Sequence, residues 1–136
     1  MKPLSPLLLL LPLASLAEAA PSLPQPTPET VACHLTYGGE TQTIAAAPTT
    51  SPYTVPAVAI GSYFLFRIVF RQEPADLASI KLYAYAARAT GPDLVHQASY
   101  AYPLAHAAFT GQNFVYEPQN GGELQYHCEL KADSQK

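Results

Sequence analysis

Two cysteines, one near each end of an alternating pattern of apolar and polar residues, are the strongest constraint on how this chain can fold. Cys33 lies in VACHLTY (31–37) and Cys128 lies in LQYHCEL (124–130), and the chain has no third cysteine. Only one intramolecular disulfide is therefore possible, and it would close a loop of about 95 residues. In the chain-entropy description such a closure contributes about 4–5 kcal/mol to stability. The bridge would hold the first and last strands of the domain together, either within one sheet or between two sheets.

The N-terminal residues have the pattern of a secretory signal peptide. Lys2 precedes an apolar run, Leu7 to Leu16, and small residues flank Glu18 at positions 17 and 19. This order is typical of a signal peptide, which we expect to span residues 1–19 with cleavage after Ala19. The run is too short to predict a membrane-spanning helix. We expect export to the periplasm, with an extracellular location as the alternative, and both compartments favour a disulfide.

The rest of the chain is long enough for one domain. Removing the 19 signal residues from 136 leaves 117, and because Lys2 and Glu18 are removed together the net charge stays at −3. Four prolines between residues 21 and 28 predict an extended leader over 20–30. We expect a β-sandwich domain over 31–131, followed by a polar tail over 132–136.

Period-two alternation between Gly and Pro turn signals predicts strands along most of the domain. No long amphipathic helix is indicated. The pattern predicts an all-β fold, a small immunoglobulin-like β-sandwich of seven or eight antiparallel strands with the first and last strands tied by the disulfide. Three prolines make residues 48–56 a loop or an edge, and residues 104–108 are expected to form a short helical turn. The expected strands are 31–37, 40–46, 62–70, 77–88, 94–102, 109–117 and 123–130.

If the first and last strands are neighbours, pairing Cys33 with Cys128 sets a register in which paired residue numbers sum to 161. His34 then lies opposite His127 on the outer face, where two imidazoles and the diagonal Glu129 could bind Zn²⁺ or Cu²⁺. If the bridge instead joins two sheets, the two histidines point away from each other. The inward pairs of the first register are all apolar: Val31–Leu130, Leu35–Tyr126 and Tyr37–Leu124.

Four tyrosines form a second candidate site. A register summing to about 185 across the TGPD turn (90–93) pairs residue 83 with 102 and residue 85 with 100, which puts all four rings on one face. An exposed face of this kind favours contact with another exported protein or with a carbohydrate. An inward face would make the same rings part of the core. These residues are Tyr83, Tyr85, Tyr100 and Tyr102.

The sequence contains no recognisable catalytic motif. GxSxG, HExxH, CxxC and Gly-rich phosphate loops are absent, although a carboxylate pair from distant loops stays open. The mildly acidic charge and scattered Lys and Arg argue against nucleic acid and against an anionic membrane surface as partners. We therefore expect an exported, non-catalytic binding or structural module, such as an accessory subunit or inhibitor, that needs no cofactor. The alternative is a periplasmic zinc- or copper-binding protein using His34 and His127.

Overall fold

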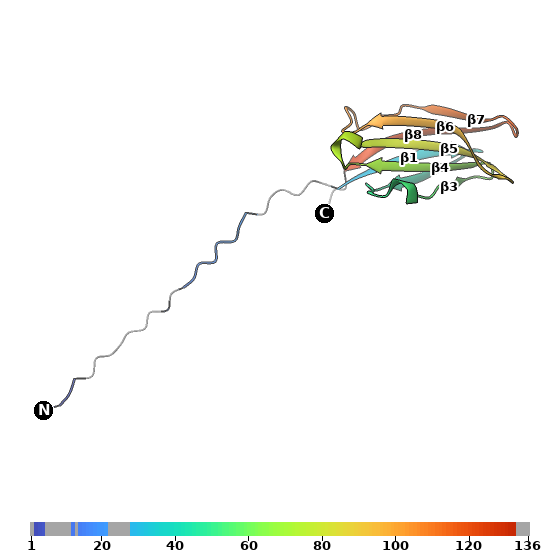
Figure 1. Cartoon of the computed structure of the whole chain (residues 1–136). Coiled ribbons are helices and arrows are strands. Elements are labelled where there is room, and N and C mark those ends of the chain that lie inside the picture. Colours follow the sequence, from blue (N-terminus) through green and yellow to red (C-terminus); the bar gives the residue numbers. More distant parts are fainter. Residues whose placement is uncertain (1, 5–11, 13, 22–27, 133–136) are drawn as a thin grey trace.

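The protein forms two antiparallel four-stranded sheets that pack face to face (Figure 1). The structure, a computed structural model, describes residues 2–4, 12, 14–21 and 28–132. Parts of the expected signal peptide and leader, and most of the expected tail, therefore lie outside the described residues. Within those residues, no helix has both the length and the apolar character needed to cross a membrane.

The first sheet contains both cysteines, and we call it the cysteine sheet. Its strand order is β2-β1-β8-β7, so the first and last strands are the central neighbours. All three neighbouring pairs are antiparallel. The strands are β1 (Glu29–Tyr37), β2 (Glu40–Ala46), β7 (Asn113–Glu117) and β8 (Gly122–Ala132).

The second sheet has the order β3-β4-β5-β6, and we call it the tyrosine sheet because two tyrosines of β5 lie on its outer face. Two short 3₁₀ helices flank β4: η1 (Pro52–Thr54) precedes it and η2 (Ala75–Leu77) follows it. The strands are β3 (Val58–Ile60), β4 (Phe64–Arg71), β5 (Ser79–Arg88) and β6 (Gly91–Ala101).

The all-β prediction is confirmed, and the differences lie at strand ends and in one loop. β1 begins at Glu29 and β8 ends at Ala132, so each strand extends slightly beyond the expected domain. The proline-rich loop is followed by a short edge strand, β3. Residues 104–108 form bends rather than the expected helical turn, and Ala108 bridges to Glu129 instead. β7 begins at Asn113, two residues after Gly111, which has a φ of 63°.

The core lies between the sheets because alternate residues of each strand point inward. β4 contributes Phe64, Phe66 and Phe70, all fully buried, and Phe66 packs against Tyr126 of β8 with ring centroids 5.1 Å apart. Burial of three phenylalanines and a tyrosine supplies a large part of the apolar area that stabilises the sandwich.

One buried ion pair joins the two sheets at an end of the sandwich. Arg88 Nη1 of β5 lies 2.9 Å from Glu117 Oε1 of β7, and the Glu117 side chain is 1% exposed. Burial opposes ionisation of Glu117, but backbone N–H groups of Asn120 and Gln119 and the Arg88 guanidinium outweigh it, so the pKa of Glu117 is lowered. The same N–H donors order the turn between β7 and β8.

Candidate functional site

The disulfide joins neighbouring strands within the cysteine sheet, which is the first of the two arrangements that the sequence left open, and the register expected for that arrangement is present. Cys33 and Cys128 are bonded and directly opposite each other in the β1–β8 ladder. The expected pairs on either side of the disulfide are present as far as Thr36–Gln125. The last expected pair, Tyr37–Leu124, is absent because the ladder ends one residue before it. Because thiols of this kind stay reduced in the cytosol, the bond indicates an oxidising compartment.

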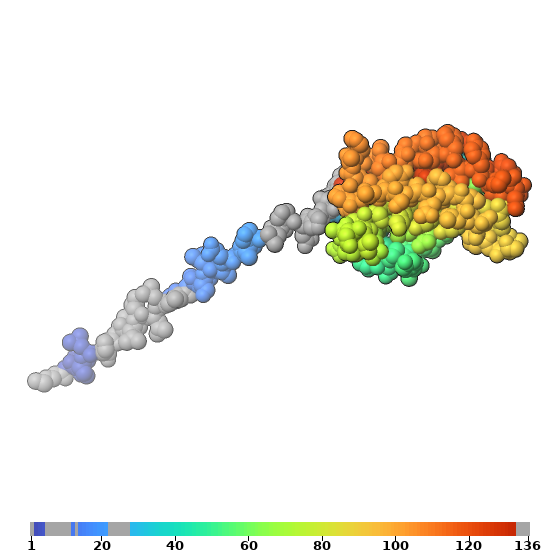
Figure 2. All heavy atoms as spheres, turned by 45° about the horizontal axis from the view of Figure 1, so that its top comes forward, coloured from blue at the N-terminus to red at the C-terminus, as the bar shows by residue number. Residues whose placement is uncertain are grey.

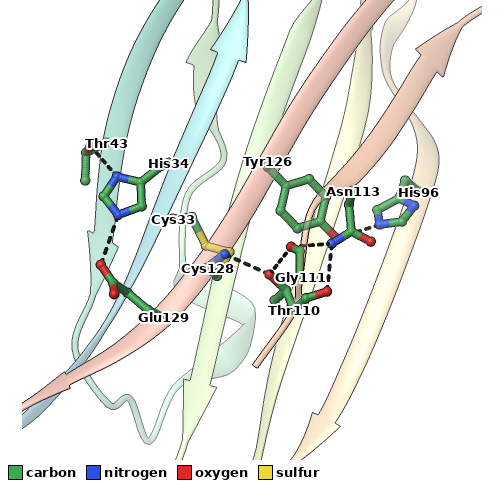
Figure 3. Close-up of a disulfide and its surroundings, with 10 residues drawn as sticks. All are labelled: Cys33, His34, Thr43, His96, Thr110, Gly111, Asn113, Tyr126, Cys128 and Glu129. Atoms are coloured by element: carbon green, nitrogen blue, oxygen red, sulfur yellow. Dashed lines mark hydrogen bonds and ion pairs between the residues drawn. A yellow bond between two sulfur atoms is a disulfide. The ribbon is translucent and has the colours of Figure 1, made fainter. Parts of the chain in front are cut away.

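Side chains from the segment before β7 support the disulfide (Figure 3). The Cys128 N–H donates to Thr110 Oγ1 at 2.8 Å. Asn113 Nδ2 donates to the carbonyl oxygens of Thr110 and Gly111, at 3.2 Å each. The Thr110 side chain thus ties the segment before β7 to β8 next to the bridge, and Asn113, the first residue of β7, orders that segment.

On the outer face of the same sheet, His34 and His127 lie side by side, as expected for a bridge within one sheet. Their ring centroids are 4.8 Å apart and their planes differ by 29°. His34 Nδ1 lies 3.0 Å from Thr43 Oγ1, and His34 Nε2 lies 3.1 Å from Glu129 Oε1 (Figure 3). Both nitrogens of His34 are therefore engaged by neighbours from β2 and β8.

Thr43, His34, Glu129 and Lys131 form a row of polar side chains on this outer face. Glu129 Oε1 also lies 3.3 Å from Lys131 Nζ. The hydrogen bond from His34, followed by that from Lys131, lowers the pKa of Glu129 despite the opposing effect of desolvation. Each charged group in the row has a partner in the protein itself.

The geometry meets one requirement of a metal site, proximity of the ligands, and does not meet another, convergence of their lone pairs. The structure brings His34, His127 and Glu129 together, as the sequence predicts. The rings stack, however, and imidazole lone pairs lie in the ring plane, so the two rings do not converge on one point in this arrangement. Among the described residues, no three His, Cys, Asp or Glu side chains form a group able to hold a metal ion. Zinc or copper binding stays a prediction for the histidine pair.

The predicted four-tyrosine face is wrong because the β5–β6 register differs from the expected one. Tyr83 lies opposite Gln97, and Ile80 lies opposite Tyr100, so paired numbers sum to 180 instead of 185. An odd shift in register turns a side chain to the other face of the sheet. Tyr100 and Tyr102 therefore pack against the core, whereas Tyr83 and Tyr85 lie on the outer face with ring centroids 6.4 Å apart.

Two local features account for the register. The turn is tighter than expected, since Gly91 already pairs with Arg88. Farther along, the pairing passes from Ala84–His96 to Tyr85–Leu94, which leaves Val95 as the extra residue of a β-bulge. Neither feature has a strong signal in the sequence.

The sequence did not predict a groove that lies on the outer face of the tyrosine sheet. Its volume is about 260 Å³, and it is bordered by both 3₁₀ helices. Figure 2 shows these two green segments on the same side of the domain as β6 in yellow and orange. No Asp or Glu is among the lining residues, which are Pro52, Tyr53, Arg67, Val69, Arg71, Leu77, Ser79, Lys81 and Tyr83.

Three cations line the groove. Lys2 aside, the chain has six Lys and Arg residues, so half of them gather here. The Arg67 guanidinium carbon lies 5.1 Å from the centroid of the Tyr83 ring, a cation–π contact, and its Nη2 donates to the Pro52 carbonyl at 2.6 Å. Arg71 Nε donates to the Glu73 carbonyl oxygen at 3.1 Å, and Lys81 is exposed.

These three cations have no carboxylate partner within the described part of the chain, where every ion pair involves a different cation. Arg67 Nε is buried and has no hydrogen-bond partner. The only signal in the sequence is Arg67 itself, a lone charge inside the apolar run 62–70. The groove depends on strand pairing and on the position of η1, so the sequence could not reveal it.

Between the sheets, His96 of β6 meets Tyr126 of β8. His96 Nε2 and Tyr126 Oη share a hydrogen bond of 2.7 Å. Desolvation lowers the pKa of His96, and burial, with a smaller effect of Tyr100, raises the pKa of Tyr126 well above its ordinary value. This contact crosses the core and is closed to large ligands, so we assign it to the fold.

Comparison with known proteins adds no constraint on function: no family model, curated protein or solved structure matches the chain.

Proposed function

We propose that the protein is an exported, non-catalytic binding module whose ligand-binding face is the outer face of the tyrosine sheet. The observation that carries this proposal is the groove, in which three cations without a carboxylate partner lie beside exposed and half-buried tyrosines. Tyr53 at its rim is 95% exposed and adds an accessible aromatic ring with a polar hydroxyl to this face. The ligand expected is another exported protein or a carbohydrate, which makes an accessory subunit or an inhibitor the corresponding role.

Export is part of the proposal. The signal-peptide pattern of residues 1–19 and the Cys33–Cys128 bond both support it. We also propose an immunoglobulin-like classification, since two packed antiparallel sheets of this size are typical of that architecture. Identifying Ala20 as the first residue of the protein recovered outside the cytosol would support this; recovery of the uncleaved chain inside the cell would contradict it.

The groove lining supports a binding role more than a catalytic one. Ser79 is its only serine, and its hydroxyl donates to the Leu77 carbonyl at 3.3 Å. No histidine or carboxylate among the lining residues could act as its base. The lining can therefore position and neutralise an anion but offers no nucleophile and base in contact.

Site-specific photo-crosslinking in the source organism tests the binding face. A photoreactive amino acid replaces Tyr53 at the groove rim in one strain and Tyr116 of β7, 63% exposed on the cysteine sheet, in a matched control strain. We expect a discrete crosslinked product from position 53 only. Products of equal yield from both positions, or from position 116 alone, would contradict the proposal.

The alternative function, zinc or copper binding, is favoured by one observation, the 4.8 Å separation of the His34 and His127 rings. Binding would require His34 Nε2 to exchange Glu129 for the ion or to share it. Calorimetry with Zn²⁺ and Cu²⁺ tests this, with His34→Ala, His127→Ala as the control. Binding at micromolar metal that disappears in the double variant supports the alternative, and the absence of binding eliminates it.

A further inference from the structure

The cations of the groove follow one another along the strands at a regular interval. Arg67 and Arg71 are four residues apart on β4, and Lys81 of β5 pairs with Val69, which lies midway between them. A strand rises about 3.3 Å per residue, so the three positions follow each other at intervals of about 6.6 Å along the sheet. Alternation places all three side chains on the same outer face.

An extended peptide has the same period. Alternate side chains of such a chain lie on one side of it and are separated by about 6.6 Å. A peptide with acidic residues at alternate positions, laid along β4 and β5, could therefore place one carboxylate at each cation. Arginine binds carboxylates with a planar pair of donors, which adds direction to the charge attraction.

The partners of the three cations leave room for such a ligand. Arg67 is held in place by the Pro52 carbonyl and the Tyr83 ring, and it has no carboxylate partner among the described residues. Arg71 has only a backbone carbonyl as partner, and no partner of the exposed Lys81 is found among the described residues.

We propose that the groove binds an extended peptide segment of a partner protein that has acidic residues at alternate positions. This inference rests on the proposed function and names the ligand of the same face. Three elements contribute to the recognition: the cations neutralise the carboxylates, Tyr53 covers an apolar side chain at the rim, and Val69 forms the apolar floor. An acidic carbohydrate is the competing ligand, and it lacks the side-chain period that matches the strands.

Titration of the oxidised domain with short synthetic peptides tests the proposal. The test peptide alternates Glu and Ser, a second has the same composition with the Glu residues in one block, and a third has Gln in place of Glu. A short uronic-acid oligomer serves as the carbohydrate probe, and inorganic phosphate controls for simple anion binding. We expect the alternating peptide to bind most tightly, with an affinity that falls as salt is raised.

Charge reversal in the groove supplies the second arm. Lys81→Glu should weaken binding of the alternating peptide by about tenfold or more, because it replaces an attraction by a repulsion. Lys131→Glu reverses an exposed cation on the opposite sheet and should leave the affinity within about twofold, a difference close to the scatter of surface substitutions. Circular dichroism of both variants shows that each is folded.

Several outcomes overturn the peptide assignment. They are equal binding of the alternating and Gln peptides, equal binding of the blocked peptide, binding of phosphate alone, and unchanged affinity in Lys81→Glu. Binding of the uronic-acid oligomer without peptide binding assigns the groove to carbohydrate instead. If position 53 crosslinks to a partner while no acidic peptide binds, only the ligand class fails. If neither occurs, the binding face fails as well.

Discussion

The outer faces of the two sheets differ in whether their charged side chains have partners within the protein. On the cysteine sheet, Thr43, His34, Glu129 and Lys131 form a continuous row in which each member has a partner. On the tyrosine sheet, Arg67, Arg71 and Lys81 share a groove that no carboxylate lines. Both faces cover the same core, so the difference lies in how side chains are paired and not in how they are supported.

The two arrangements of charged side chains have different consequences for an incoming ligand. A polar row whose members satisfy one another gains little from a ligand, because a ligand must first displace internal partners. A group of like charges without partners repels itself and is relieved by an anion. Proteins tend to break the rules of local satisfaction at functional sites, and the tyrosine sheet breaks them where the cysteine sheet does not.

Removing the disulfide should have the largest effect on stability. We expect Cys33→Ala, Cys128→Ala to lower the free energy of unfolding by about 4–5 kcal/mol, because the bond limits the unfolded chain over a loop of 95 residues. Urea denaturation of the variant and the oxidised parent measures the change. A loss below about 1 kcal/mol would show that the cysteine sheet is not the structural half of the comparison.

Breaking the Arg88–Glu117 ion pair, which belongs to neither outer face, should have the second largest effect on stability. Its sign follows from linkage: the pKa of Glu117 is lowered in the folded protein, so its contribution is present above the ordinary value of 4.5 and lost as pH falls through the folded pKa. We expect Glu117→Gln to lower the Tm at pH 7 and to reduce the loss of stability on acidification below about pH 4.5. Thermal melts from pH 7 to pH 3 measure both effects, and parallel curves for the two proteins would contradict the assignment.

Breaking the His96–Tyr126 contact should have the third largest effect on stability. The contact also makes the stability depend on pH. The pKa of His96 is lowered from 6.5 in the folded protein. As pH drops below about 6.5, His96 is therefore protonated more readily in the unfolded chain than in the folded one, and the free energy of unfolding falls. Tyr126→Phe should cost about 1–3 kcal/mol at pH 7.5, because it leaves a half-buried imidazole unpaired. His96→Gln should remove the corresponding part of the slope between pH 7.5 and pH 5.5 in denaturant titrations. An unchanged slope would locate the proton uptake elsewhere.

A substitution in the groove should have the smallest effect on stability. Lys81→Gln removes an exposed charge that has no partner among the described residues, and we expect a change within about 0.5 kcal/mol at pH 7 and low salt. A small gain in stability is the expected sign, because the variant relieves repulsion from two arginines. A loss above 1 kcal/mol in urea denaturation would mean that Lys81 has a structural role, which would weaken the contrast between the faces.

The two halves of the molecule also differ in how well the sequence predicts them. A covalent bond anchors β1 to β8, and one pair, Cys33–Cys128, then sets every other pair in that ladder. The alternation of apolar residues leads to the same register, so the position of His34 beside His127 could be predicted as well. Covalent and hydrophobic constraints agree on this register, but they did not decide between a bridge within one sheet and a bridge between two sheets, and the structure has the bridge within one sheet.

The tyrosine sheet has no such anchor. Its β5–β6 register depends on a tight turn at Gly91 and a bulge at Val95, and an error of five residues moved Tyr100 to the wrong face. The groove is harder still to foresee, since it requires η1 to lie against β4 and brings together cations up to fourteen positions apart in the chain. Tertiary placement decides both features, and neither local propensity nor spacing encodes it.

Nuclear magnetic resonance mapping of the alternating acidic peptide on the oxidised domain tests the contrast between the faces most directly. The structure predicts that backbone amide shifts gather around Arg67, Lys81 and Tyr83, on the outer face of β4 and β5. Amides around His34 and His127 should stay unchanged in the same titration. Shifts centred on the histidine pair, or no shifts on either face, would contradict the assignment of binding to the tyrosine sheet and structure to the cysteine sheet.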